Sequence, residues 1–107
     1  MNPRIPASYE EIGRWLRGFA ISHAKRESPR IEAVVEMEEE REGRSYGLRL
    51  VLGALALPPR DQPPFEFSYA EVRDGRTRFA WCEALARRLR GEARRLLEEE
   101  TRAPRSA

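Results

Sequence analysis

The stretch SYGLRLVLGALAL, residues 45–57, decides the fold of this chain. Its first half has a period of two, with an apolar side chain at every second position from Tyr46 to Leu52. This alternation is typical of a strand that is buried on one face. From Leu50 to Leu57 both faces are apolar. Because such a run is typical of a strand with cover on both sides, we expect this strand to be enclosed.

Val51, Leu55 and Leu57 fall on the face of this strand that the alternation would leave to solvent. Two helices can cover only one face of a small sheet, so these three side chains need another cover. A second copy or a protein partner would supply it, and cover from the same chain is the alternative. The sequence therefore predicts a protein-interaction or self-associating module, most simply a homodimer formed through the sheet face.

A shorter strand and a helix precede this stretch. Apolar residues occupy alternate positions over Ile31–Met37, and the polar run Glu39–Arg44 that follows favours a hairpin connection. Nearer the N-terminus, Ser8–Glu11 has the S-x-x-E pattern of a capping box. Apolar residues then recur at three- and four-residue spacing as far as His23. This spacing predicts an amphipathic helix that ends before Pro29.

A loop, a strand and a long helix follow the stretch 45–57. The four prolines of 58–64 predict a stiff loop that cannot join a strand ladder. Residues 65–70 alternate as a third strand, which is expected to end at the turn signal Asp74-Gly75. Arg76–Trp81 fits either a fourth strand or the start of a helix. Because a longer apolar stripe begins at Phe79 and has helical spacing, we expect a helix from about Thr77 to Glu100.

These elements together predict an α+β fold. It consists of a helix, a three-stranded antiparallel meander and a long C-terminal helix, with both helices on one face of the sheet. We expect one domain over residues 8–100, a flexible arm at 1–7 and a disordered tail at 101–107. A chain of 107 residues is long enough for one such domain to bury its own core.

Composition indicates a globular protein of the cytoplasm. Hydrophobic residues make up 40% of the chain, enough to form a core despite 36% charged residues. The single cysteine, Cys82, excludes an intramolecular disulfide, and the first residues lack the pattern of a secretory signal. The longest apolar run, Leu50–Leu57, is far shorter than the roughly 20 residues of a membrane-spanning helix. We therefore expect no membrane segment.

No motif in the sequence points to catalysis, a cofactor or a metal. His23 is the only histidine and Cys82 the only cysteine, so a zinc set cannot be assembled from them. The chain has neither a glycine-rich phosphate loop nor a nucleophile elbow. The acidic residues between Glu32 and Glu42 lack the spacing of a calcium loop and fit a solvated face. We expect no enzyme activity, no cofactor and no metal.

Arginine dominates the basic residues: nineteen of the twenty are Arg, and Lys25 is the exception. The planar guanidinium suits phosphate, which would favour a nucleic-acid partner. Coding bias in a GC-rich genome explains the same excess, and the sequence leaves the choice open. Arg73, Arg76 and Arg78 surround the turn before the last helix, where free amides also favour an anion. This turn is the best candidate for an anion or nucleic-acid site.

The predicted element order resembles that of the double-stranded-RNA-binding domain, and the resemblance covers nearly the whole chain. It implies RNA or DNA binding as an alternative function. In that family a lysine cluster opens the second helix, whereas the corresponding stretch here, RTRFAW at residues 76–81, contains no lysine and two large aromatic residues. The resemblance is therefore one of topology, and no binding residue follows from it.

Overall fold

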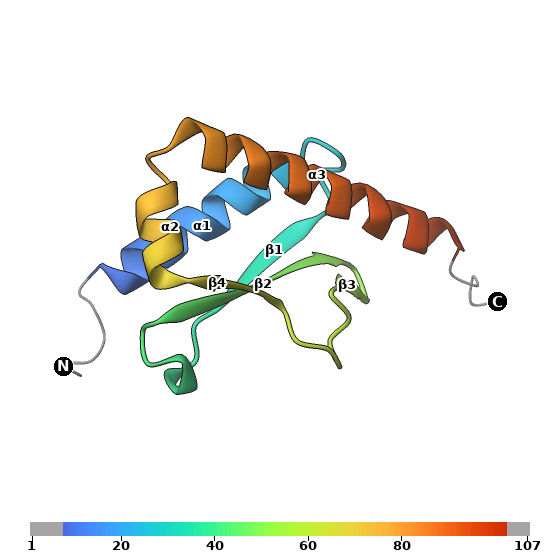
Figure 1. Ribbon diagram of the computed structural model, residues 1–107. Helices are drawn as coiled ribbons and strands as arrows, with labels where there is room; N and C mark the ends of the chain where they lie inside the picture. Colours follow the sequence, from blue (N-terminus) through green and yellow to red (C-terminus); the bar gives the residue numbers. More distant parts are fainter. Residues whose placement is uncertain (1–7, 103–107) are drawn as a thin grey trace.

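A computed structural model of the chain describes residues 8–102. Helices cover one side of an antiparallel sheet, which confirms the predicted α+β class (Figure 1). In chain order the elements are α1 (Tyr9–Ala24), β1 (Glu32–Glu36), the short 3-10 helix η1 (Glu39–Arg41), β2 (Ser45–Leu52), β3 (Leu55–Leu57), β4 (Phe65–Ser68), α2 (Tyr69–Gly75) and α3 (Phe79–Arg102). The predictions for residues 1–7 and 103–107 lie outside the described residues, whereas Thr101 and Arg102 are helical.

β2 is the central strand of the sheet. β1 runs antiparallel along one of its edges, with Glu32 opposite Val51 and Glu36 opposite Gly47. The other edge is shared, because β3 pairs with the C-terminal end of β2 and β4 pairs with its N-terminal end. Two short strands thus share the place that the predicted third strand would fill: β4 comes from residues 65–70 of that prediction, whereas β3 comes from the end of the predicted second strand. The proline loop connects them (Figure 1).

The stretch 45–57 is a hairpin, so the prediction of one enclosed strand is wrong. Gly53 and Ala54 form a two-residue turn, and Gly53 has a φ of 61°. Glycine adopts this left-handed conformation without strain, and hairpin turns of this length require it. The chain reverses there, which brings Leu55 opposite Leu52 and Leu57 opposite Leu50. Leucines of both strands therefore lie on the same face of the sheet, and this reversal explains why residues 50–57 are apolar at both odd and even positions.

The short helix α2 replaces the end of the predicted third strand. Ser68 caps this helix, because its Oγ accepts a hydrogen bond from the backbone N–H of Glu71 at 3.0 Å. Residues 65–70 are therefore not all strand, and Asp74-Gly75 lies at the end of helix α2 and not at the end of a strand. The signal was present in the sequence, since Ser68–Glu71 has the S-x-x-E pattern of a capping box. The same pattern at Ser8–Glu11 gives no such cap, because the Ser8 side chain forms no capping hydrogen bond and bonds the Tyr69 hydroxyl instead.

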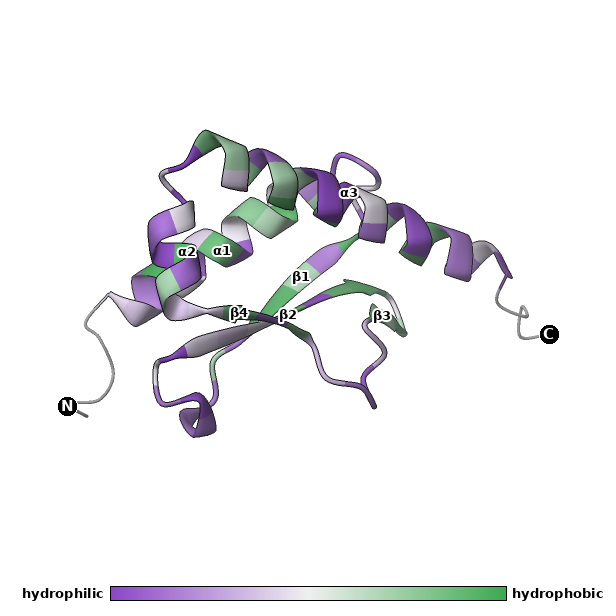
Figure 2. Ribbon diagram, in the orientation of Figure 1, coloured by the Kyte–Doolittle hydropathy of each residue, from purple (hydrophilic) through white to green (hydrophobic). Residues whose placement is uncertain are grey.

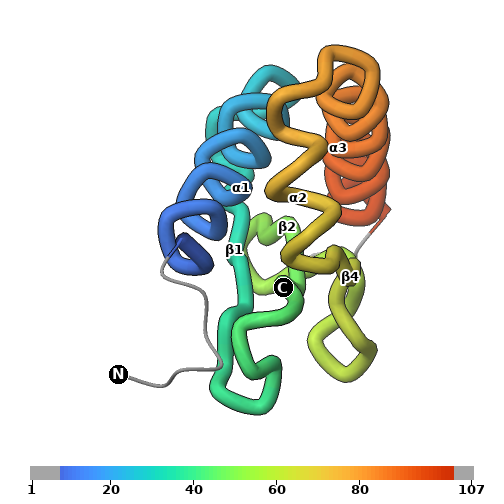
Figure 3. Tube along the Cα trace, turned by 60° about the vertical axis from the view of Figure 1, so that its left-hand side comes forward, coloured from blue at the N-terminus to red at the C-terminus, as the bar shows by residue number. Residues whose placement is uncertain are grey.

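The long C-terminal helix begins at Phe79. This confirms the helical alternative for residues 76–81 and excludes a strand there. Figure 3 shows α1 and α3 side by side on the same side of the sheet. The structure therefore confirms that both helices of the prediction pack on one sheet face. Figure 2 shows that the residues of α3 are mostly hydrophilic toward its C-terminal end.

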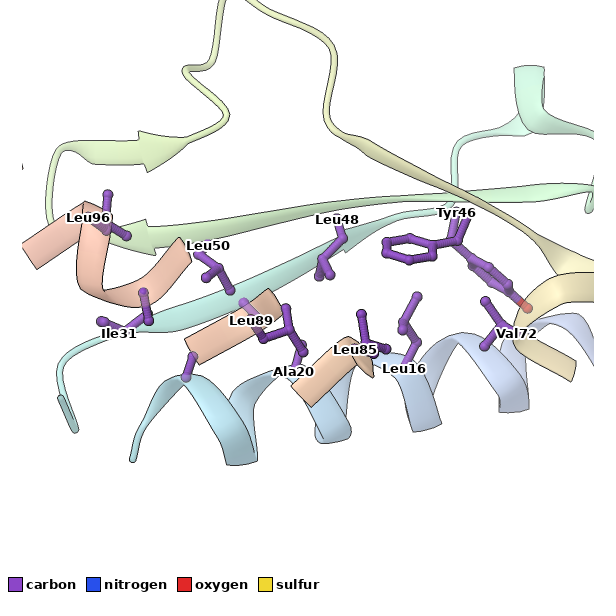
Figure 4. Packing of buried hydrophobic residues seen from close by; sticks show 14 of the residues in the cluster. Leu16, Ala20, Ile31, Tyr46, Leu48, Leu50, Val72, Leu85, Leu89 and Leu96 are labelled. Carbon is purple, nitrogen blue, oxygen red and sulfur yellow. The ribbon is translucent and has the colours of Figure 1, made fainter. Parts of the chain in front are cut away.

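The core lies between the sheet and these helices (Figure 4). Leu16 and Ala20 come from α1, Leu48 and Leu50 from β2, and Leu89 from α3; each is at most 2% exposed. Burying a leucine side chain stabilises the folded state by about 1.5–3 kcal/mol relative to leaving it in water. Within residues 8–102, no helix has both the length and the apolar character that crossing a membrane requires.

Candidate interaction surfaces

The structure does not bring the three predicted interface residues together. Directly paired residues of antiparallel strands lie on the same face of the sheet. Leu55 and Leu57 are paired with Leu52 and Leu50, which are buried under the helices, so they lie on the helix-facing side. Val51 lies on the opposite face. The prediction that all three share one open face is wrong, because the turn at residues 53–54 reverses the alternation.

The face of the sheet that points away from the helices is partly covered by the chain itself. Arg49 projects from β2 on this face, with only 13% of its side chain exposed. Its Nε donates to Glu36 at 2.8 Å, Nη1 donates to the carbonyls of Pro58 and Pro59 at 3.0 and 2.7 Å, and Nη2 donates to the carbonyl of Gln62 at 2.7 Å. One arginine therefore fixes the proline loop to the sheet.

Arg41 covers the other end of this face. Its side chain is 9% exposed, Nε donates to Glu38 at 2.9 Å, and Nη1 donates to Glu66 at 2.6 Å and to Ser45 Oγ at 3.0 Å. The hydrogen bond to Glu66 raises the pKa of Arg41, which keeps the guanidinium charged. Gly47 lies beneath, and a Cβ there would come within 2.5 Å of Arg41 Nη2. The glycine thus provides the space that the arginine occupies.

The predicted anion site is brought together only in part. Arg73 donates to Asp74 at 2.9 Å and lies 5.5 Å from the centre of the Tyr69 ring, so its charge is already engaged. Arg76 and Arg78 are exposed in the turn between α2 and α3, and neither side chain forms an ion pair with any residue of the described range 8–102. Two free arginines remain of the three.

A groove between α1 and α3 is the surface that the sequence reasoning missed. Its volume is about 270 Å³, and Phe79 stands at the first position of α3 with 81% of its surface exposed. The residues that line the groove are Phe19, His23, Phe79, Cys82, Glu83, Ala86 and Arg90. The sequence assigned Phe79 to the buried stripe of the helix, which is wrong. The buried stripe runs through Leu85 and Leu89 instead, and Phe79 belongs to the neighbouring row that faces α1.

A row of aromatic rings forms the α1 side of this surface. The ring centroids of Trp15 and Phe19 are 5.0 Å apart, and those of Phe19 and His23 are 4.5 Å apart. Trp81 approaches Trp15 from α3 at 6.2 Å. These rings are only partly buried, so together with Phe79 they expose an apolar patch on the helical side of the molecule.

Two polar atoms of the groove residues lack partners within the described part of the chain. His23 Nδ1 and Arg90 Nε are both shielded from solvent and have no hydrogen-bond partner among residues 8–102. Burial lowers the pKa of His23, and the nearby Arg26 and Arg90 lower it further, so the imidazole is neutral at pH 7. Glu83 is the acidic group of the groove, and it accepts a hydrogen bond from Arg87 at 2.8 Å. Buried polar groups without partners are rare in native proteins.

The groove also brings His23 and Cys82 to one place. The Cys82 thiol donates to the backbone carbonyls of Gly75 and Arg76, each at 3.6 Å, so backbone oxygens and not the imidazole engage its proton. Across the part of the chain that the structure describes, no group of three or more His, Cys, Asp or Glu side chains is placed to hold a metal ion. The arrangement is suited to binding an apolar group.

A larger groove, of about 690 Å³, lies between β3, the proline loop and the C-terminal half of α3. Its floor is formed by Leu55, Leu57 and Leu96. Its basic side chains already have partners, because Arg60 donates to the carbonyl of Ala54 at 2.7 Å and Arg95 donates to Glu92 at 3.0 Å. Among residues 8–102, the shielded polar side-chain atoms without a partner belong to residues of the α1–α3 groove and to none of this one.

Comparisons with known proteins give no relative from which a function could be transferred: no family model, no curated protein and no solved structure matches the chain.

Proposed function

We propose that this chain is a non-enzymatic protein-interaction module and that its binding surface is the groove between α1 and α3. The observation that carries the proposal is the side chain of Phe79, which is 81% exposed at the rim of an apolar groove. Exposed aromatic residues beside a concave apolar surface are typical of interaction sites. Covering this ring would add about 1.5–3 kcal/mol of hydrophobic stabilisation to a complex.

The chemistry of the surface also favours a protein partner. Trp, Tyr and Arg are the residues that dominate the binding energy of protein interfaces. Here Trp15, Phe19 and Phe79 are grouped with Arg90, whose Nε has no acceptor among residues 8–102. On the sheet face, by contrast, Arg49 is already fully engaged by the chain. The helical face is therefore the better candidate.

Selection from a displayed peptide library tests the proposal without a known partner. Peptides enriched on the immobilised chain would be measured by fluorescence anisotropy against the wild type and Phe79→Ser. We expect the variant to bind at least about tenfold more weakly, a loss of about 1.4 kcal/mol. Val34→Ser is the matched control, because Val34 is the other large exposed apolar residue within residues 8–102 and lies on the outer face of the sheet, opposite Arg49.

Two results would contradict the proposal. One is equal affinity of the selected peptides for the wild type and Phe79→Ser. The other is an equal loss in Val34→Ser, which would indicate the sheet face. Because Phe79 is so exposed, its replacement should leave the fold unchanged, and the thermal unfolding midpoint of each variant checks this.

Nucleic-acid binding is the second candidate, and the free arginines of the α2–α3 turn favour it. Arg76 and Arg78 are exposed next to Phe79, so phosphate contacts and base stacking could be made from one place. A single-stranded oligonucleotide should then bind with an affinity that falls with salt and with the double substitution Arg76→Ala/Arg78→Ala. The control is Arg94→Ala/Arg95→Ala. An equal effect of both double substitutions would count against a site at this turn.

A further inference from the structure

We infer that the occupant of the α1–α3 groove is a second copy of this chain, related to the first by a two-fold axis. This inference rests on the proposed function, because it takes the groove as the binding surface. It adds the identity of the partner and the way in which the two surfaces fit.

The first argument is shape. In a two-fold symmetric dimer the same patch of both copies meets, so a projection and a recess must lie side by side on one face. Phe79 is such a projection, and the groove lined by Phe19 and Ala86 is the recess beside it. Each copy can therefore insert its Phe79 into the groove of the other. A benzene ring fits an apolar cavity of about 150 Å³, and the groove has a volume of about 270 Å³.

The second argument is charge. The groove carries one acidic residue, Glu83, and one basic residue, Arg90, and Arg90 has no ion pair among residues 8–102. The two-fold axis would bring Glu83 of one copy to Arg90 of the other, twice. Glu83 already accepts one bond from Arg87, and a carboxylate can accept several donors. Within the groove lining, the charges are thus complementary to themselves.

Self-association through an edge of the sheet is less favourable than association through the α1–α3 groove. β1 is an edge strand within the described sheet, and its central residue, Val34, is 44% exposed. An antiparallel pair of two β1 strands centred on Val34 would place Glu32 of each copy opposite Glu36 of the other. Like charges directly opposite each other in a ladder are destabilising, and they protect an edge from such pairing.

Sedimentation equilibrium of the complete chain tests the inference. Over a protein concentration range of about 1–200 µM, we expect the wild type to pass from monomer to dimer. Phe79→Ser should weaken the dimer at least about tenfold, and the control Val34→Ser should leave it unchanged. Circular dichroism of each variant would check that its helices remain folded.

Charge reversal gives a sharper test of the two-fold arrangement. Glu83→Arg and Arg90→Glu should each weaken the dimer, because each creates like-charged pairs across the interface. The double substitution restores opposite charges and should recover the wild-type dissociation constant within about threefold. Within one chain Glu83 pairs with Arg87 and forms no ion pair with Arg90, so such a rescue points to pairing between two copies.

The outcomes separate this inference from the proposed function. A wild type that stays monomeric at every concentration overturns the inference, and Phe79-dependent binding of selected peptides would then support a different protein partner. A dimer that is insensitive to Phe79→Ser but lost in Val34→Ser also overturns it and moves the interface to the sheet. A dimer weakened by both single charge reversals and restored by the double substitution supports it.

Discussion

Arginine has two distinct roles in this protein. Arg41 and Arg49 are largely shielded side chains whose guanidinium groups bind carboxylates and carbonyls on the outer face of the sheet. Arg76 and Arg78, by contrast, are exposed without an ion pair in the described range. The sequence shows that arginine is abundant but not which role each one has, because partners such as the carbonyl of Gln62 are distant in sequence and carry no signal.

Arg49→Lys tests the first role. A lysine offers one ammonium group in place of the planar fork, and it cannot serve Glu36 and the loop carbonyls together. Bonds to charged groups contribute about 1.5–3 kcal/mol each, so we expect the free energy of unfolding to fall by about 2 kcal/mol. Urea denaturation measures this fall. Arg95→Lys, on an exposed helix surface, should change it by less than about 0.5 kcal/mol; equal effects would show that Arg49 does not fix the loop.

His23 should make the stability depend on pH. Burial lowers the pKa of His23 in the folded state below the ordinary value of 6.5, and the nearby Arg26 and Arg90 lower it further. Glu83 is the acidic residue that lines the same groove. The unfolded chain therefore binds more protons as the pH falls through 6.5, and the free energy of unfolding decreases there. The decrease is complete once the pH is below the folded-state pKa. It should be absent in His23→Gln.

Urea denaturation of dilute protein between about pH 7.5 and pH 5 measures this effect. The window is separate from that of the carboxylates. Glu32 and Glu100 have a pKa below the ordinary 4.5 because of their hydrogen bonds to Lys25 and Arg30, so their contribution is lost only at lower pH. A pH dependence that persists unchanged in His23→Gln would contradict the assignment to this imidazole.

At the scale of elements, the sequence predicted the longer helices and strands and missed three short elements, η1, β3 and α2. The periods of α1, β1 and the first half of β2 are long enough to be read directly. The hairpin of β2 and β3 was missed because its turn residue, Gly53, lies inside a run that is apolar on both sides, with no polar residue to mark the turn. α2 was missed because alternation over Phe65–Tyr69 outweighed the capping pattern that starts at Ser68.

Ser68→Ala tests the capping of α2. Replacing an N-cap serine with alanine leaves an amide of the first turn without its acceptor and typically costs about 1 kcal/mol. We expect a loss of this size in the free energy of unfolding, because the Ser68 hydroxyl accepts from Glu71. Ser22→Ala, at an exposed position inside α1, should cause no loss. If both substitutions have the same effect, the cap does not stabilise α2.

The candidate site was harder to predict than the fold, and Phe79 shows why. It has the helical spacing of the apolar stripe, so the sequence assigns it to the core. Which row of a helix is buried depends on where neighbouring elements lie, and here Trp81 packs over Gly75 while Phe79 remains outside. Interaction surfaces built from apolar residues resemble core in sequence, and only the packing separates them.

At the scale of the whole molecule, the two sides differ in how much of their chemistry the chain itself satisfies. The outer face of the sheet is partly covered by Arg41, Arg49 and the proline loop. The helical side exposes Phe79, and the groove beside it is lined by His23 and Arg90, each with a shielded polar atom that has no hydrogen-bond partner among residues 8–102. This difference is the reason for our proposal that association takes place on the helical side, with a second copy as the partner.

Tryptophan fluorescence tests this assignment most directly, because both tryptophans of the chain, Trp15 and Trp81, lie beside the groove with ring centroids 6.2 Å apart. The measurement is acrylamide quenching of their emission over a series of protein concentrations. The account predicts that quenching weakens as the concentration rises in the wild type, and that Phe79→Ser keeps the quenching of the dilute protein throughout. Quenching of the wild type that does not change with concentration would contradict it.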